Sequence, residues 1–551
     1  MLSASVPRRV GWIAIALILL SVGTASAQTR IITILNADDG ETVSDSLTGE
    51  VTRLIGNVRL QSDTTLLRAN RATITDNRRR ALMEGRVRIL SGTDTLTADR
   101  VSYDATTRIA EATGNVRIGS EDGVLFAPMV TYNARDKRAQ FSGDGRLLQD
   151  GAELLAPSGT YETERRFAEV DGPLTLRDSA STLTAARGTY DARSRRADVV
   201  GTVRLLRDPD RLDADSLVYF RRTERARAFG RVVLDRVGEG ADSLRRGLLF
   251  GSRLVYDGQN ETASMTADSL FALAVFLDRD STGRVDSTFV RALAFNASRE
   301  DRGGIRTEVL TAVGTTRLWR DALSAVADSA AFVRTTLPDS LSDAPPRDRL
   351  DLFGGALGLD RPAVWASGSQ IVGDTLQIQS GALRDSVFAT SRAFAAQLDS
   401  TLGRVQQLAG ERMLGIVVDD ALRRLHVWPA AQALAYQATA DGLLESAIRV
   451  GADSLVFRFD ADGEIRETVF FGDEGTVDGE RIPGALVRDE RLPGFAFDPD
   501  RRPVREDLLS GWEAAWLAAN PDWQRTLEAP EPPDPARLGT EAEEAGAVES
   551  E

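Results

Sequence analysis

The sequence contains no cysteine, a single histidine (His426) and a single lysine (Lys137) among 551 residues. Without cysteine there is no disulfide, thiolate nucleophile or cysteine-ligated metal site. One histidine excludes a metal site built from several imidazoles and leaves one candidate base for a nucleophilic triad. Acidic residues outnumber basic residues by 82 to 67, which gives a formal net charge of −15. The chain therefore lacks the surplus of cations that would make nucleic acid its main partner.

The composition that remains is that of a globular protein, with 42% hydrophobic and 27% charged residues. Its N-terminus has the features of a secretory signal peptide: Arg8 and Arg9, an apolar run over 10–22, and the small residues 25–27 before a mature terminus at Gln28. The run is shorter than the roughly 20 residues that cross a bilayer as a helix, which favours cleavage over an uncleaved anchor. We expect an exported protein, soluble or peripherally attached to a membrane.

A repeat of 29 residues dominates the first half of the chain. Its most regular column is glycine, at Gly56, Gly85, Gly114, Gly143, Gly172, Gly201 and Gly230. Three further columns keep the same interval. They are leucine at Leu67, Leu96, Leu125, Leu154, Leu183 and Leu212; alanine at Ala69, Ala98, Ala127, Ala156, Ala185 and Ala214; and tyrosine at Tyr103, Tyr132, Tyr161, Tyr190 and Tyr219. A fixed period of this length is typical of stacked structural repeats.

Each repeat is predicted to form two β-strands. After the glycine, apolar and polar residues alternate, as in Val58-Arg59-Leu60, which is typical of a strand with one buried face. The second strand runs from the leucine column through the alanine column to tyrosine. Alanine and tyrosine are five residues apart, which breaks the alternation and predicts a bulge or bend. The glycine column is predicted to mark a corner that excludes a Cβ atom or brings two backbones close together.

The apolar columns of stacked repeats would line a common interior. The many alanines there are compatible with two arrangements, a two-sheet sandwich that needs small residues to interdigitate and a groove left open for a hydrocarbon ligand. For the groove, the candidate lipid-binding residues are Val58, Leu60, Val87, Ile89, Val116, Ile118, Val203 and Leu205.

The sequence shows little that could carry catalysis. His426 lies in the apolar run 425–428 without a recognisable serine or acidic partner, so we interpret it as structural. The acidic segment Asp460–Glu464 lacks the spacing of a calcium loop and is interpreted as a turn. We therefore expect no catalytic residues, no metal, no cofactor and no enzymatic activity.

The repeat resembles a known family. The Gly-Asn-Val-Arg units at 56–59 and 114–117, together with the recurring Leu-x-Ala-x(4)-Tyr strand, are similar to the OstA-like proteins of lipopolysaccharide transport. These include the periplasmic bridge protein and the N-terminal domain of the outer-membrane translocon. The resemblance covers 54–271, although the Gly-Asn step becomes Gly85-Arg86, Gly143-Asp144 and Gly172-Pro173 elsewhere. A second stretch, 404–505, is similar to the C-terminal part of larger Bacteroidota members, through 405–410, 422–425, 454–459, 492–495 and 501–503.

This resemblance implies an all-β fold in which the repeats form an open β-jelly roll, or β-taco, whose groove receives the acyl chains of lipid A. It implies a lipopolysaccharide carrier of the periplasm or the periplasmic face of the outer membrane, which docks through edge strands to other transport components or head to tail to itself. The expected organisation is a signal peptide (1–27), a repeat domain (28–300), irregular strands and a linker (301–350), a second OstA-like β module (351–505), an amphipathic helix (506–527) and a disordered acidic tail (528–551).

Two other interpretations remain open at this point. One is a structural or adhesive β-solenoid of the cell surface, which would have a filled core and no lipid ligand. The other is a carbohydrate-active enzyme on a β-helix, which should present carboxylates on successive rungs. None of the repeat columns is acidic, which disfavours the enzyme.

Overall fold

The computed structural model describes residues 31–45, 49–119, 123–208, 210–237, 245–268, 271–279, 285–321, 323–337, 347–355, 361–366, 368–380, 384–418, 421–460, 465–472, 477–509 and 511–521. The predicted signal peptide, the acidic tail and Trp523 lie outside these residues. The chain forms two compact units, one of residues 1–116 with 131–135 and the other of residues 117–130 with 136–551. Within the described residues, no helix is long and apolar enough to cross a membrane.

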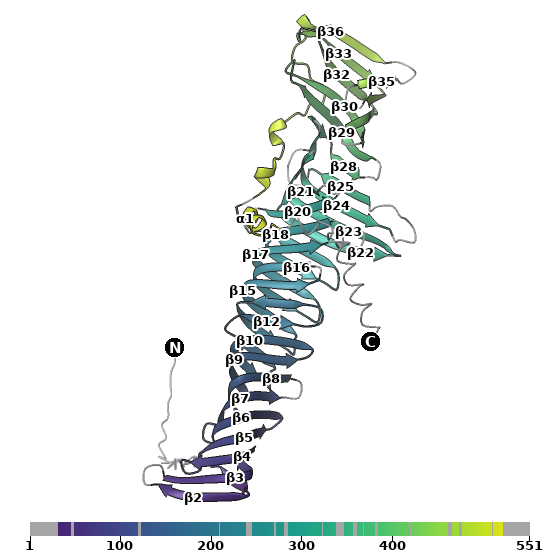
Figure 1. The fold of residues 1–551 in the computed structure, drawn as a ribbon. Coiled ribbons are helices and arrows are strands. Elements are labelled where there is room, and N and C mark those ends of the chain that lie inside the picture. The colour runs from purple at the N-terminus through teal and green to yellow at the C-terminus, as the bar shows by residue number, and fades with distance from the viewer. Residues whose placement is uncertain are drawn as a thin grey trace, which may run out of the picture. The chain divides into compact units, whose positions relative to one another are not determined.

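Most of the predicted repeats form two long strands joined by a tight turn, whereas the repeat of Gly172 is divided into four short strands (Figure 1). The first unit contains β1 (Thr33–Asn36), β2 (Asp39–Asp45), β3 (Gly49–Ser62), β4 (Thr65–Thr75), β5 (Arg80–Ser91) and β6 (Asp94–Asp104). β7 (Ile109–Gly119) and β8 (Gly123–Asn133) have residues in both units. The second unit continues with β9 (Arg138–Gln149), β10 (Ala152–Glu162), β11 (Phe167–Val170), β12 (Leu174–Arg177), β13 (Thr182–Ala185), β14 (Arg187–Asp191), β15 (Arg196–Arg207), β16 (Asp210–Phe220), β17 (Arg225–Val237) and β18 (Arg245–Asp257).

The strands pair with antiparallel neighbours throughout the described residues. β3 pairs with β4, β4 with β5, and β5 with β6 in the first unit; β9 pairs with β10, and β15 with β16, in the second. This pairing confirms the all-β jelly-roll prediction. It is incompatible with a parallel β-solenoid and with a parallel β-helix, because those folds require parallel ladders.

The glycine column was predicted to mark a corner, and in most repeats the glycine lies at a bulge with positive φ. Gly85 has φ +75° and Gly201 has φ +81°, values in the left-handed region that favours glycine. The ladder shifts register at each of these corners, between Glu84 and Val87 in one repeat and between Val200 and Val203 in the other. The predicted irregularity of the second strand is confirmed by the same shifts, since the partner strand slips at the same corner.

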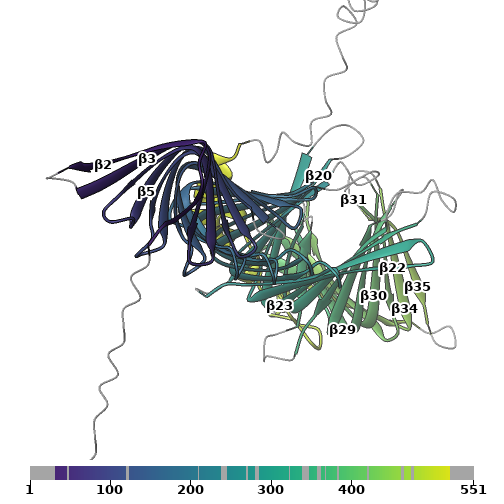
Figure 2. The same ribbon diagram turned by 90° about the horizontal axis from the view of Figure 1, so that it is seen from below.

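The corner folds each strand pair onto itself. Gln149 is the partner of Ala152 at one end of the β9–β10 pair, and Tyr161 lies at the other end of β10. Nine extended residues span about 30 Å. The Tyr161 hydroxyl nevertheless lies 3.2 Å from Gln149 Oε1, so the two ends of the pair meet. Figure 2 shows the same bending in β3 and β5.

Each unit therefore has two walls joined at the glycine corner. We call the wall that carries the tyrosine column wall 1 and the wall that carries the leucine column wall 2. The rim is the line along which the outer ends of the two walls meet, formed by the turns at both ends of the strand pairs. Along the strands of the regular repeats, one face points between the walls and is buried, while the other face carries residues such as Arg59 and Arg88, which are exposed.

The rest of the second unit repeats this pattern less regularly. It comprises β19 (Thr262–Thr266), β20 (Ala272–Arg279), β21 (Val285–Ala292), β22 (Ala294–Arg302), β23 (Ile305–Arg320), β24 (Leu323–Thr336), β25 (Arg347–Phe353), β26 (Ala363–Ala366), β27 (Ser369–Val372), β28 (Thr375–Ser380), β29 (Asp385–Asp399), β30 (Arg404–Val418), β31 (Ala421–Trp428), β32 (Ala431–Ala438), β33 (Leu444–Ala452), β34 (Ser454–Phe459), β35 (Ile465–Phe471) and β36 (Asp478–Pro483). Corner bulges recur between Val313 and Thr316 and between Thr390 and Ala393.

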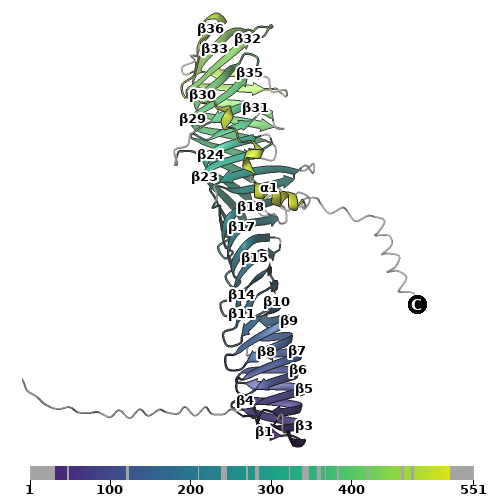
Figure 3. The same ribbon diagram turned by 90° about the vertical axis from the view of Figure 1, so that its left-hand side faces the viewer.

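After β36 the chain turns back along the second unit (Figure 3). This returning segment, residues 484–519, we call the strap. Its described residues form three short 3-10 helices, η3 (Gly484–Leu486), η4 (Pro499–Arg501) and η5 (Arg505–Leu508), and the helix α1 (Gly511–Ala519). α1 lies within the range 506–527 for which a helix was predicted and is shorter than that range, and it is docked on the same chain.

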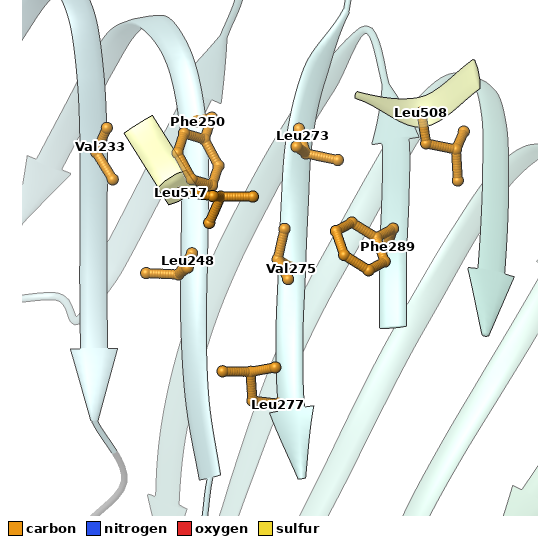
Figure 4. Packing of buried hydrophobic residues seen from close by; sticks show 9 residues of the cluster. All are labelled: Val233, Leu248, Phe250, Leu273, Val275, Leu277, Phe289, Leu508 and Leu517. Carbon is orange, nitrogen blue, oxygen red and sulfur yellow. The ribbon is translucent and has the colours of Figure 1, made fainter. Parts of the chain in front are cut away.

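The strap packs on the outer face of wall 2. Val233 follows the inward-facing Val232, so its side chain points outward, where earlier repeats carry arginines such as Arg204. Phe250 is its cross-strand partner and shares that face. Leu508 and Leu517 of the strap pack against this face. The same buried cluster contains Leu273, Val275 and Phe289 of the neighbouring strands (Figure 4). The outward columns of β17, β18, β20 and β21 are apolar because the strap removes them from water.

Candidate functional site

The eight predicted groove residues all point between the walls and are buried. Their exposed fractions are Val58 1%, Leu60 0%, Val87 1%, Ile89 1%, Val116 1%, Ile118 1%, Val203 2% and Leu205 8%. They lie on wall 2, where neighbouring strands bring several of them into one row: Leu60 pairs with Leu67, which pairs with Ile89. In the second unit Leu205 lies between Leu183 and Leu212. The result is a continuous apolar strip within each unit.

Wall 1 faces this strip with a different set of side chains. In the first unit Met83, Val101 and Tyr103 are at most 1% exposed. Ala81 of wall 1 and Ala98 of wall 2 are also buried, at 1% and 6% exposed. Farther along the second unit the rings of Phe276 and Phe332 lie 5.6 Å apart. The interior is therefore apolar on both sides, and side chains of the two walls fill it.

Polar side chains join the two walls at the rim. The Tyr132 hydroxyl of wall 1 donates to Asp94 Oδ2 of wall 2 at 2.6 Å. Tyr161 donates to Gln149 in the next repeat, where the position equivalent to Asp94 is Gly123. Tyr132 and Tyr161 thus span the interior from one wall to the other, whereas the buried hydroxyl of Tyr103 has no hydrogen-bond partner among the described residues. The tyrosine column is buried because the ring belongs to the apolar interior and only its hydroxyl needs a polar partner at the rim.

Arginine–carboxylate pairs also bridge the rim, at three places among the described residues. In the second unit Arg221 Nε lies 2.8 Å from Asp178 Oδ2, and Arg207 Nη1 lies 2.7 Å from Glu224 Oε2. In the first unit Arg108 pairs with Asp63. The Arg221–Asp178 pair is the most enclosed of the three, with side chains 10% and 14% exposed. A second donor of Arg221 reaches the Tyr190 hydroxyl at 2.8 Å.

The pKa shifts follow this burial. Burial tends to raise the pKa of Asp178, but hydrogen bonds from the Ala180 amide and from Arg221 outweigh it and hold the pKa below 3.8. Burial opposes the charge of Arg221, yet its bond to Asp178 raises its pKa. Burial raises the pKa of Tyr190 and Tyr219. At neutral pH the Arg221–Asp178 bridge is therefore a charged pair, with protonated Tyr190 and Tyr219 near it.

The sequence pattern did not reveal the rim bridges. The two partners Asp94 and Tyr132 are 38 residues apart. The corresponding partner column reads Thr65, Asp94, Gly123, Ala152 and Ser181, so its residue type changes from repeat to repeat. Only the tyrosine column itself gave a signal.

His426 has the environment of a structural residue. Its Nε2 atom lies 2.8 Å from Ser454 Oγ, and its ring stacks on Trp428 at 4.2 Å between centroids. In the part of the chain that the structure describes, no carboxylate pairs with the other ring nitrogen, and Ser454 is 9% exposed. Among the same residues, no cluster of acidic or histidine side chains could hold a metal ion.

A cavity of about 640 Å³ lies beside the strap in the second unit. It lies against the corner glycines Gly230 and Gly251, with Trp512 of α1 and the guanidinium groups of Arg231 and Arg317 in its lining. The cavity is separate from the apolar strip, because the corner and strap residues that line it do not belong to the inward-facing columns.

Comparison with known proteins identifies one family. Residues 29–186 match the family described as "OstA-like protein". No curated protein matches the chain. Among solved structures, the chain is similar to LptH of Pseudomonas aeruginosa, described as the LptA homologous periplasmic component of the conserved lipopolysaccharide transport device.

The similarity to LptH has 17% identity, covers 25% of this chain and 80% of LptH, and has a TM-score of 0.14. A TM-score of this size supports no inference from LptH by itself. The family match covers β1 to β13, which include repeats with the glycine corners, the apolar strip and the tyrosine column. Through residues 29–186 the chain is similar to the OstA-like proteins.

Proposed function

We propose that this protein binds lipopolysaccharide and carries it through the periplasm to the outer membrane, without catalysis. The observation that supports this best is the continuous apolar strip between two walls whose rim is polar. Such a site would hold acyl chains between the walls and leave a charged head group at the rim. The OstA-like family assignment points the same way.

Burial of acyl chains would supply the driving force for this role. Each methylene removed from water contributes about 0.8 kcal/mol, so an acyl chain of about ten methylenes contributes roughly 8 kcal/mol before ordering costs. Side chains fill the space between the walls in the described structure, so the lipid would separate the walls and replace contacts between them. We assign the contacts on wall 2 to Val58, Leu60, Val87, Ile89, Val116, Ile118, Val203 and Leu205.

The edge strands support docking to other components of the transport route or to a second copy of the chain. β35 pairs with β34 and β36 with β33, which leaves one edge of each free of any pairing in the described residues. β35 also exposes Ile465 and Phe471, at 57% and 53%. A free edge with exposed apolar residues can add a partner strand through main-chain hydrogen bonds.

The test is native mass spectrometry of the mature protein purified from its own periplasm, with extraction of bound lipid. We expect lipid A or lipopolysaccharide to copurify with the wild type and to be lost from the variant Val116→Asp/Ile118→Asp. The matched control is Arg117→Asp, which places the same residue between them on the exposed face. Circular dichroism establishes that the variants are folded.

The alternative is a structural β-protein of the cell surface without a lipid ligand. The buried interior supports this alternative, because an interior that side chains already fill needs no ligand. A wild-type protein that is free of lipid and takes up no added lipopolysaccharide would establish that alternative and contradict the carrier function.

A further inference from the structure

The three arginines of the rim stand where the head group of a lipid would lie. Arg108, Arg207 and Arg221 each bridge from the turns of one wall to a carboxylate of the other. They lie at the rim, because Arg207 is the last residue of β15, Arg221 directly follows β16 and Arg108 directly precedes β7. Separation of the walls would break all three pairs and leave the guanidinium groups at the opening.

We propose that Arg207 and Arg221 bind the anionic head group of a lipid held in the second unit, and that Arg108 binds that of a lipid held in the first unit. Glu224, Asp178 and Asp63 hold these arginines until a head group replaces them. The inference rests on the lipid-carrier function proposed above. The ligand class is an amphiphile with phosphate groups and several acyl chains.

The chemistry of the pairs supports this exchange. A guanidinium binds a phosphate with the same fork of N–H donors that it offers a carboxylate. Arg221 already uses Nε and Nη2 for Asp178, so a phosphate oxygen can replace Oδ2 without a change of donor. Without this replacement, opening the rim would leave a largely buried cation unpaired, which is costly. Lipids without an anionic group would therefore open the rim less readily.

Asp178 has two separable roles. Its Oδ1 accepts the turn amides of Ala180 and Ser181 at 2.9 and 2.7 Å, whereas Oδ2 accepts from Arg221. Asn at this position keeps an Oδ1 acceptor for the turn and removes the charge that competes with the head group. Asp178→Asn should therefore bind a phosphorylated lipid more tightly, whereas Arg221→Gln should bind it more weakly.

The experiment measures equilibrium binding of the full mature chain to lipid A and to lipid A from which the phosphates have been removed. For lipid A we expect affinity to rise about tenfold in Asp178→Asn and to fall about tenfold in Arg221→Gln, from the typical strength of a charged hydrogen bond. For the dephosphorylated lipid we expect the two variants to have equal affinities, because both lose the bridge between residues 178 and 221.

The pair Glu224→Gln and Arg207→Gln repeats the comparison at a rim pair that is 39% and 38% exposed, where a folding defect is least expected. Arg204→Gln is the control, because Arg204 pairs with Asp213 on the outer face of wall 2. If the arginine variants and the carboxylate variants change the affinity in the same direction for both lipids, the arginines only join the walls. That result would overturn the inference. A wild type that binds neither lipid would instead contradict the carrier function itself.

Discussion

At the scale of single residues, the corner glycines determine where each strand folds back. At Gly201 a Cβ atom would lie 2.8 Å from the Cβ of Ala186, which belongs to the preceding strand pair. The Ala186 amide also donates to the Gly201 carbonyl at 2.8 Å, so neither backbone can move away freely. The glycine is thus required for two reasons, a positive φ and close contact between neighbouring backbones.

These two reasons can be separated by substitution. Gly151 lies in the β9–β10 turn with φ +72°, and a Cβ atom at this position would meet nothing within 4 Å, so Gly151→Ala introduces strain alone. We expect it to lower the free energy of unfolding by about 1–2 kcal/mol, the cost of a left-handed alanine. Gly201→Ala should cost about 1–3 kcal/mol more, because it also overpacks the corner. Urea denaturation measures both.

A double variant provides the control. Ala186→Gly removes the Cβ that Gly201→Ala would meet, so the two changes together should destabilise by less than the sum of their separate effects. Strict additivity would contradict the proposed steric contact and leave backbone strain as the whole explanation.

His426 gives a prediction about pH. Burial, and then the positive charge of Arg424, lower its pKa below 6.5 in the folded protein. The unfolded chain therefore binds the proton more readily, so the free energy of unfolding should fall as the pH drops from about 7.5 to about 5.5. His426→Gln should lose this part of the pH dependence, because the chain has no other histidine. An unchanged slope in the variant would show that the dependence comes from other groups.

At the scale of elements, the strap explains why alternation fails after the seventh glycine. Val232 and Val233 are both buried, one between the walls and the other beneath the strap. The rings of Trp512 and Trp516 lie edge-on to Phe250 at 5.7 and 5.4 Å. Adjacent buried residues in β17 were a signal in the sequence, but periodicity does not say which later segment covers the second face.

One ion pair fixes α1 on the wall. Arg291 Nη2 lies 2.7 Å from Glu513 Oε2, and Arg291 Nε donates to the Leu508 carbonyl at 2.6 Å. Glu513 is 3% exposed at its side chain, so Glu513→Gln leaves a largely buried cation without its counter-charge. We expect local destabilisation of about 3 kcal/mol and correspondingly faster hydrogen exchange of the α1 amides.

The matched control is Asp489→Asn, in a strap ion pair with Arg491 whose side chains are 73% and 58% exposed. Exposed pairs contribute about 1 kcal/mol or less, so exchange of the strap amides should hardly change. Equal effects of the two substitutions would mean that the ion pair of α1 does not determine its docking.

The regular part of the fold could be predicted from sequence because the same spacing of glycine, leucine, alanine and tyrosine recurs in successive repeats. Seven glycines and the Leu-x-Ala-x(4)-Tyr strand predicted the strand pairs, the corner and the eight inward residues of wall 2. The rim pairs could not be predicted, because Asp178 and Arg221 meet only after two strand pairs have folded at their corners. Which rim residues meet depends on how the folded repeats stack, and the partners do not recur as a residue type at the 29-residue interval.

At the scale of the whole molecule, the absence of cysteine makes the rim accessible to a direct test. The double variant Asp94→Cys/Tyr132→Cys places the only two thiols on opposite walls of the first unit. Joining them with a short bifunctional maleimide should prevent separation of the walls there and reduce uptake of lipopolysaccharide severalfold, measured as lipid bound per chain.

The control for this prediction joins two thiols within one wall. Arg88→Cys/Thr97→Cys places them on cross-strand partners of wall 2, so the same reagent should leave uptake unchanged. Uptake that survives the bridge across the rim would show that lipid reaches the interior without separation of the walls at Asp94 and Tyr132.

The 29-residue interval makes the length of the repeat array adjustable by whole rungs. Each regular 29-residue repeat, which forms one rung of the array, has its own corner, tyrosine and turns. The residue columns of one repeat continue directly into the next. Removal of residues 196–224 would join Arg195 to Arg225 with glycine, leucine and tyrosine columns still in phase, whereas removal of one residue more or fewer would turn the next strand inside out. Duplication or loss of such a segment offers evolution, and the experimenter, a way to lengthen or shorten the second unit in equal steps while its cross-section stays the same.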